Sequence, residues 1–179
     1  MKQRCNNSGD IWKCIEQVHL TSADCLKTHK SCLASEDMPL PRRVIDVGTL
    51  DILPHLIESD GKIGKYIALS HSWGGIAPLV TTKANLIQMK QGLPLESFPK
   101  TFRETMLVAR DLGIQYVWID CLCLVQDNIV EWQTDSGKMA DIYGNSYLTV
   151  AATLARNAHD GLFFTAAHDG AGPLEINRN

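Results

Sequence analysis

Residues 116–143 read YVWIDCLCLVQDNIVEWQTDSGKMADIY, and this stretch decides the fold class. The apolar, β-branched and aromatic run Tyr116–Ile119 predicts a buried strand, which stops at Asp120. A helical pattern follows over residues 129–143. A buried strand that leads through polar residues into a helix is typical of open α/β sheets, which bind ligands at the carboxyl ends of their strands. We therefore expect a functional site in this segment.

The same alternation of elements extends through the rest of the chain. Further strands are predicted at residues 44–47, 66–69 and 147–152, and further helices at residues 10–33, 82–90 and 101–112. Thr101 and Glu104 have the form of a capping box at the start of the last of these helices. Helices that alternate with buried strands predict an open, mainly parallel sheet that is flanked by helices.

Composition and charge limit the classes of function. The chain has 179 residues, which suits one domain with a substantial core. A net charge of -3 gives no broad basic surface for nucleic acid or anionic lipid. The apolar runs have the length of strands, so no membrane span is expected. Six cysteines without a visible export signal indicate a reduced, cytoplasmic protein.

Two carboxylates and a serine are candidate site residues. Asp135 shares a predicted helix face with Trp132 and Met139, and a carboxylate beside an apolar stripe is typical of a functional site. The competing interpretation is an aspartate near a helix N-terminus that interacts with the helix dipole. Asp120 and Ser70 each end a predicted strand. Either residue can bind a ligand, or it can form hydrogen bonds with the backbone amides of a neighbouring loop.

Three further patterns have structural explanations that we favour. Cys123 and His71 can form a thiol nucleophile and its base, but an inert buried cysteine is commoner. The spacing of Cys25, His29 and Cys32 does not match the strong zinc-finger patterns, so we expect no metal site. Trp73 can stack on a planar ligand or pack in the core.

Three blocks of sequence resemble the fungal heterokaryon-incompatibility (HET) domain. YIALSHSWG at Tyr66–Gly74 is similar to the family pattern Y-x-x-L-S-Y-x-W-G. The run from Tyr116 to Asp127 is similar to Y-L-W-I-D-x-L-C-I-x-Q-D, and EWQTDSGKMADIY at residues 131–143 to D-W-x-x-E-x-x-x-M-x-x-I-Y. The resemblance extends over residues 10–165.

This resemblance implies a fold, a domain organisation and a biological role. HET domains act in fungal non-self recognition and trigger cell death, and they are distant relatives of TIR domains, which have a flavodoxin-like fold. The implied organisation is an N-terminal helical extension at residues 1–36, a TIR-like HET domain at residues 37–165, and a loose tail at residues 166–179. The implied alternative to an enzyme is a non-catalytic module that self-associates or binds a regulatory protein.

The resemblance also implies a chemistry. Some TIR domains hydrolyse NAD+ with the glutamate of a W-C-x-x-E motif, and Trp132 to Asp135 is similar in spacing. Asp135 is therefore the implied catalytic residue and NAD+ the implied substrate, with no other cofactor required. The implied ligand-binding residues are Ser70, Trp73, Gly74, Asp120, Cys123, Gln126, Asp127, Trp132 and Tyr143.

Aspartate in place of the family glutamate changes the expected geometry. Its carboxylate is withdrawn by about 1.5 Å, the length of one C–C bond. A misplacement near 1 Å can cost on the order of 100-fold in rate. Glu131 precedes Trp132 and points about 100° away from it on a helix, so we do not expect it to replace the glutamate.

Overall fold

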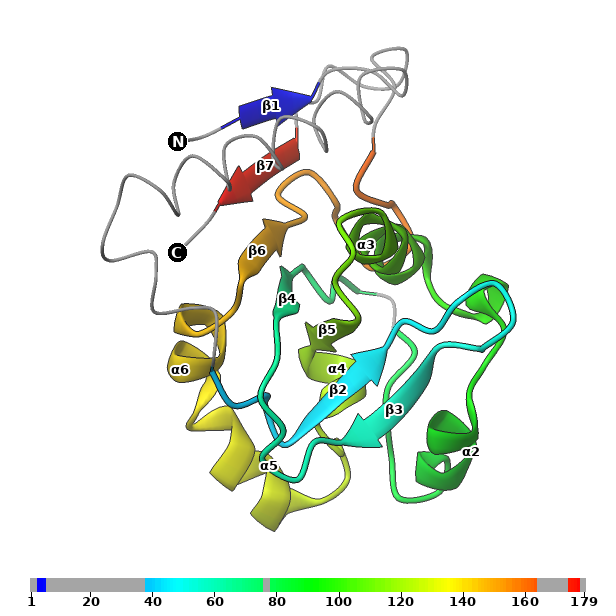
Figure 1. Ribbon diagram of the computed structural model, residues 1–179, viewed down its shortest axis with the longest axis vertical. Coiled ribbons are helices and arrows are strands. Elements are labelled where there is room, and N and C mark those ends of the chain that lie inside the picture. The colour runs from blue at the N-terminus through cyan, green and yellow to red at the C-terminus, as the bar shows by residue number, and fades with distance from the viewer. Residues whose placement is uncertain (1–2, 6–37, 76–77, 164–173, 178–179) are drawn as a thin grey trace.

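A mixed β-sheet organises the part of the chain that the structure describes (Figure 1). This computed structural model describes residues 3–5, 38–75, 78–163 and 174–177, the first and last of these as backbone only. Seven strands pair in the order β1-β7-β6-β4-β5-β2-β3. The strands are β1 (Gln3–Cys5), β2 (Arg43–Asp46), β3 (His55–Glu58), β4 (Tyr66–Ser70), β5 (Tyr116–Ile119), β6 (Leu148–Ala151) and β7 (Leu174–Asn177).

The α/β class with flanking helices is confirmed, but the prediction of a mainly parallel sheet is wrong. Within the described residues, only the pairs β4–β5 and β4–β6 are parallel, and the other four pairs are antiparallel. β2 and β3 follow each other without an intervening helix, so they pair as an antiparallel hairpin. β2 then pairs antiparallel with β5. The parallel character is thus confined to the three strands at the centre of the sheet.

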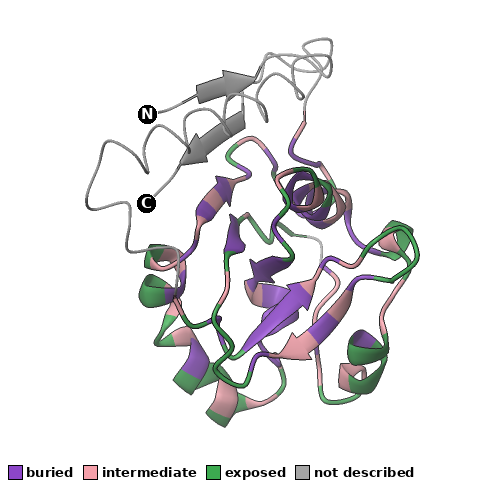
Figure 2. Cartoon of the chain, in the orientation of Figure 1, coloured by how far each residue is buried: buried purple, intermediate pink, exposed green. Residues whose placement is uncertain are grey.

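Helices cover the central strands on both sides (Figure 1). They are α2 (Leu86–Gln91), α3 (Lys100–Asp111), α4 (Asp120–Cys123), α5 (Ile129–Ser136) and α6 (Met139–Gly144), with a short 3-10 turn at Leu95–Ser97. α3 lies on one side, and α5 and α6 lie on the other. All four residues of β5 are buried as a result (Figure 2). No helix among the described residues combines the length and the apolar character that crossing a membrane requires.

The helix predicted over residues 129–143 is interrupted. α5 ends at Ser136, and α6 begins at Met139 after a break at Gly137 and Lys138. Glycine is the poorest helix former after proline, which explains why the break falls here. α4 is a single turn that the sequence did not predict, while the helix predicted at residues 10–33 lies outside the described residues.

The predicted capping box at Thr101 and Glu104 is wrong. α3 begins after Pro99, and no described side chain caps its N-terminus. Thr101 Oγ1 instead accepts a hydrogen bond from the Gly161 amide at 3.0 Å, and Glu104 Oε2 accepts one from the Leu162 amide at 2.5 Å. These two side chains therefore hold the segment after β6 against α3.

The predicted domain boundaries are only partly within the described residues. Most of the predicted N-terminal extension at residues 1–36 lies outside them, so that boundary stays a prediction. β7 lies inside the predicted loose tail at residues 166–179, yet its backbone pairs antiparallel with β6. This part of the tail therefore belongs to the sheet.

Candidate functional site

The predicted site residues occupy two neighbouring places rather than one. Asp135 lines a pocket whose wall includes residues of β2 and β5. We call it the Asp135 pocket. Ser70, His71, Trp73, Asp120, Cys121 and Tyr143 lie where β4 and β5 end, and we call them the strand-end cluster. Nothing in the described part of the chain shows a direct contact between Asp135 and Asp120.

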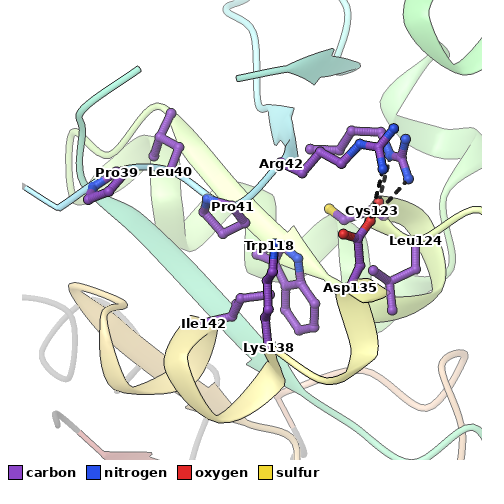
Figure 3. Close-up of a pocket in the computed structure, with 11 residues that line it drawn as sticks. Pro39, Leu40, Pro41, Arg42, Trp118, Cys123, Leu124, Asp135, Lys138 and Ile142 are labelled. Carbon is purple, nitrogen blue, oxygen red and sulfur yellow. Dashed lines mark hydrogen bonds and ion pairs between the residues drawn. The ribbon is translucent and has the colours of Figure 1, made fainter. Parts of the chain in front are cut away.

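The Asp135 pocket has a volume of about 190 Å³ and combines apolar walls with charged side chains (Figure 3). It is lined by Pro39, Leu40, Pro41, Arg42, Arg43, Trp118, Cys123, Leu124, Asp135, Lys138 and Ile142. Figure 3 shows the Asp135 carboxylate pointing toward the arginine side chains, with the Trp118 indole beside it. A carboxylate, an aromatic ring and cationic groups thus face one small space.

Arg43 is the centre of the charges in this pocket. It is almost fully buried, and its Nε donates a hydrogen bond to the Cys123 carbonyl at 3.0 Å. Its Nη2 lies 2.9 Å from Glu131 Oε2 and 3.5 Å from Asp135 Oδ2. Its Nη1 lies 3.6 Å from Glu58 Oε1. One buried guanidinium therefore meets three carboxylates, one on β3 and two on α5, so its buried charge is paired.

Arg42 adds a second, more exposed guanidinium to the same group. Its Nη2 donates to Glu131 Oε1 at 2.7 Å, and its Nη1 lies 3.7 Å from Asp135 Oδ2. Partial burial pushes the pKa of Glu131 upward, but hydrogen bonding to Arg43 and the charges of Arg43 and Arg42 outweigh this and lower the pKa. The Glu131 carboxylate is thus held in its ionised form.

The face that the sequence predicted for Asp135 requires a correction. Glu131 and Asp135 are four residues apart on α5, so they lie on the same side of the helix and meet the same arginines. Trp132 was expected on the apolar face, but it is 43% exposed. Because the helix breaks at Gly137, Trp132 and Met139 do not share a continuous stripe with Asp135.

Trp118 and Tyr143 connect the two places. The Trp118 indole lines the Asp135 pocket and meets the Tyr143 ring edge-on, with centroids 5.5 Å apart. The Tyr143 hydroxyl donates to the Leu69 carbonyl at 3.2 Å, near the end of β4. Burial, and secondarily the Asp120 carboxylate, raise the pKa of Tyr143 to about 12. Tyr143 is therefore a neutral hydrogen-bond donor at physiological pH.

Asp120 organises the strand-end cluster. It is the first residue of α4, directly after β5. Its Oδ2 accepts a hydrogen bond from Trp73 Nε1 at 2.9 Å, and its Oδ1 accepts one from the Cys121 amide at 2.7 Å. The Asp120 side chain is 19% exposed, so it remains accessible. Both interpretations offered for Asp120 are thus compatible with its surroundings, since it holds a loop and faces solvent.

Among the described residues, neither ring nitrogen of His71 has a hydrogen-bond partner, although the side chain is only 1% exposed. The ring packs edge-on against Phe102 of α3, with centroids 4.9 Å apart. Its Nδ1 lies 3.7 Å from Asp120 Oδ1. Burial lowers the pKa of His71 against the opposing effect of Asp120. The imidazole is therefore neutral at physiological pH.

Gly74 allows the loop after β4 to approach the segment after β6. Its φ is +61°, and a Cβ at this position would lie 2.6 Å from the Arg156 carbonyl oxygen. Ser70, at the end of β4, is exposed, and its carbonyl accepts from the Ala152 amide at 2.8 Å. Both residues thus position the cluster through their backbone.

Three other predicted binding residues stabilise the chain after β5. Cys123 is buried and accepts a hydrogen bond on Sγ from the Ile119 amide at 3.4 Å, while burial raises its pKa to about 12. Gln126 Nε2 donates to the Asp120 carbonyl at 3.2 Å. Asp127 Oδ1 accepts from the Lys83 amide at 2.8 Å. The structure places Cys121, not Cys123, next to His71.

The sequence did not predict the pocket roles of Arg42, Arg43, Glu131 and Trp118. The signal for Arg43 was its position at the start of an apolar strand, because a charge in a buried strand must be paired. No local signal could identify its partners, since Glu131 is 88 residues away in the sequence. The roles predicted for the site residues stay predictions.

Comparison with known proteins gives one match. The family model described as Heterokaryon incompatibility protein (HET) matches residues 66–177. The matched segment covers more than half of the 179 residues and runs from β4 to β7. It includes the strand-end cluster and α5 with Asp135. Searches of curated proteins and of solved structures found no match.

Proposed function

The chain belongs to the heterokaryon incompatibility (HET) family, and on this premise we propose that it is a cytoplasmic effector of fungal non-self recognition and cell death. We propose further that it acts like a TIR domain, by binding NAD+ in the Asp135 pocket and cleaving the nicotinamide–ribose bond. The observation that carries this proposal is the meeting of a buried carboxylate, an indole and two guanidinium groups in one pocket.

The size and chemistry of the pocket suit one end of a dinucleotide. Its volume of about 190 Å³ is below the ~300–1,000 Å³ of pockets that enclose drug-sized ligands, so it accommodates the nicotinamide riboside end rather than whole NAD+. The buried Trp118 indole forms part of the apolar wall beside which the planar nicotinamide would lie. Arg42 is about half exposed, and its guanidinium can bind the pyrophosphate outside the pocket.

The proposed reaction needs one carboxylate. Cleavage of the nicotinamide–ribose bond builds positive charge on the ribose, as in glycoside hydrolysis, and the nicotinamide leaves as a neutral molecule. The Asp135 carboxylate stabilises this charge, and water completes the hydrolysis. Glu131 lies one helical turn away and shares the same arginines, so its role is to position them.

Nicotinamide release from NAD+ by the purified full chain tests this proposal. We expect Asp135→Asn to lower the rate at least ~100-fold, because it removes the charge and keeps the shape. Asp141→Asn is the matched control, since Asp141 is an exposed acid on α6. Asp135→Glu restores the family residue and is expected to keep or raise the rate. No release by the wild-type chain at high concentration, together with a silent Asp135→Glu variant, would refute the enzyme.

A second candidate function is a non-catalytic module that signals by self-association or by binding a regulatory protein. Three apolar side chains of α5 favour it: Ile129, Val130 and Trp132 are 71%, 75% and 43% exposed. Neighbouring exposed apolar side chains are typical of interaction surfaces. The structure also gives Asp135 a structural explanation, because its carboxylate is held by Arg42 and Arg43.

Mass measurement across a range of protein concentrations tests the second candidate. We expect a concentration-dependent oligomer that Val130→Asp disrupts. Gln88→Asp, at an exposed position of the separate helix α2, is the control. Toxicity in the host separates the two functions. Asp135→Asn should abolish toxicity if the protein is an enzyme, and should leave toxicity largely intact if it is a non-catalytic module. A strict monomer that captures no partner would exclude the module.

A further inference from the structure

We infer that His71, Asp120 and Cys121 form a binding site for a transition-metal ion, with zinc as the preferred ion. This site lies at the carboxyl ends of β4 and β5 and does not depend on the proposed function of the Asp135 pocket. His71 directly follows β4, and Asp120 and Cys121 begin α4 directly after β5, so all three residues lie at the ends of two neighbouring parallel strands.

The spacing of the donor atoms is close to what a metal ion requires. One ring nitrogen of His71, one carboxylate oxygen of Asp120 and the Cys121 Sγ lie within 4.8 Å of one another. Zinc bonds of ~2.0–2.3 Å in a tetrahedral arrangement place ligand atoms roughly 3.3–3.7 Å apart. His71 Nδ1 and Asp120 Oδ1 already lie 3.7 Å apart. Small side-chain rotations can therefore bring all three ligands onto one ion.

The His71 ring provides the independent indication of a ligand. Buried polar groups are almost always hydrogen-bonded, and an exception needs an explanation. Both His71 nitrogens are buried, and neither has a hydrogen-bond partner in the part of the chain that the structure describes. The ring is neutral, which is the form that coordinates metals, and its Nδ1 faces the Asp120 carboxylate. A metal ion between them would satisfy this otherwise unpaired nitrogen.

The surroundings of Asp120 orient its carboxylate for coordination. Trp73 Nε1 and the Cys121 amide each donate to one of its oxygens, which leaves further lone pairs for an ion. Such outer partners fix the ligands of metal sites. Asp120 is partly exposed, which leaves room for a water or substrate molecule as the fourth ligand, as in catalytic zinc sites.

The donor set selects the class of metal. A thiolate and an imidazole with one carboxylate suit zinc and related transition metals, whereas magnesium and calcium prefer oxygen ligands throughout. Cys121 must lose its proton to bind. Burial, and secondarily Asp120, raise the pKa of the Cys121 thiol in the metal-free chain. A nearby dication reverses this effect, since coordinating thiols are deprotonated.

Cobalt titration of the full chain tests the site. The four cysteines at positions 5, 14, 25 and 32 are first changed to serine, so that they cannot bind the metal, and the protein is stripped with EDTA. We expect one equivalent of Co²⁺ to bind with an intense thiolate-to-cobalt charge-transfer band, and Zn²⁺ to displace it. Absence of this band, or of stoichiometric Zn²⁺ binding, would overturn the inference.

A graded set of variants identifies the ligands. Cys121→Ser and His71→Gln are expected to weaken Zn²⁺ binding by more than ~100-fold, and Trp73→Phe by ~10–100-fold through loss of its bond to Asp120. Cys123→Ser is the matched control, because Cys123 is an equally buried cysteine of the same helical turn. Circular dichroism verifies folding. Binding that survives Cys121→Ser, or that is lost equally in Cys123→Ser, would contradict the assignment.

Discussion

Arg43 shows how a single residue connects the fold to the candidate site. Its guanidinium is buried and bonds to the Cys123 carbonyl, Glu58, Glu131 and Asp135. Arg43→Met would keep much of the side-chain length but leave the carboxylates without their buried partner. Breaking a buried ion pair by removing one partner costs roughly 3–5 kcal/mol, so we expect a loss of this size in urea unfolding. The urea concentration at the midpoint of unfolding should decrease, while the m-value should stay unchanged.

Arg42 is the control for this substitution, because it meets Glu131 and Asp135 from the exposed side. Exposed ion pairs contribute about 1 kcal/mol or less, so Arg42→Met should lower stability far less than Arg43→Met. Equal losses for the two variants would mean that burial of Arg43 does not govern the cluster.

Glu131 should make the stability of the protein depend on acid pH. Hydrogen bonds and charge from Arg43 and Arg42 outweigh the effect of partial burial and lower its pKa in the folded state. The unfolded chain therefore binds the proton more tightly. The stabilisation is complete above the ordinary value of 4.5 and is lost as the pH falls through the lower folded value. Urea unfolding between pH 7 and pH 3 should show a shallower loss for Glu131→Gln than for the wild type.

Glu96→Gln provides the comparison for this pH dependence, since Glu96 is exposed. Its unfolding curves should follow the wild type at every pH. A Glu131→Gln variant with the wild-type pH dependence would show that Glu131 is not the group responsible.

At the residue scale, the sequence predicted the candidate carboxylate but not its partners. Asp135 is buried and lines a pocket, while its predicted catalytic role stays a prediction. The orientation of Trp132 was predicted wrongly, because the assumed continuous apolar stripe does not exist. Arg43 and Glu131 meet only through the tertiary fold, and no periodicity in the sequence encodes a contact across 88 positions.

At the element scale, Glu104 stabilises the segment after β6 rather than the start of its own helix. Its Oε2 accepts from the Leu162 amide at 2.5 Å and from the Phe163 amide at 3.3 Å. Hydrogen bonds to a charged group contribute about 1.5–3 kcal/mol, so we expect Glu104→Ala to lower stability by about 2 kcal/mol. Hydrogen exchange should accelerate most at the amides of Leu162 and Phe163.

Glu96→Ala should change neither measurement, because Glu96 is exposed in the turn before α3. If Glu104→Ala left exchange at Leu162 and Phe163 unchanged, these amides would not depend on the carboxylate. The capping-box pattern predicted a polar pair with the correct chemistry at the correct positions. It assigned the wrong donors to these two acceptors, because the amides that they bind lie about 60 residues later in the chain.

At the scale of the whole molecule, buried strands were predictable and their directions were not. Residues 44–47, 66–69, 116–119 and 147–152 were predicted as strands, and β2, β4, β5 and β6 occupy these segments. A fully buried strand has the same apolar composition whether its neighbour is parallel or antiparallel. The antiparallel position of β2 beside β5 therefore depends on packing between distant segments, which composition does not reveal.

The last strand should be needed for a stable, monomeric protein. β7 pairs with β6 on one side and with β1 on the other, so removal of residues 166–179 would take the partner from both strands. β6 would become an exposed edge of the sheet, and unpaired edges promote association between chains. We expect the chain that ends at residue 165 to unfold at lower urea concentration and to aggregate.

Ile176→Pro should produce a smaller loss of stability in the same direction, because proline removes a backbone donor within β7. A truncated chain that is as stable and monomeric as the full chain would instead place the domain boundary at residue 165, as the sequence alone predicts.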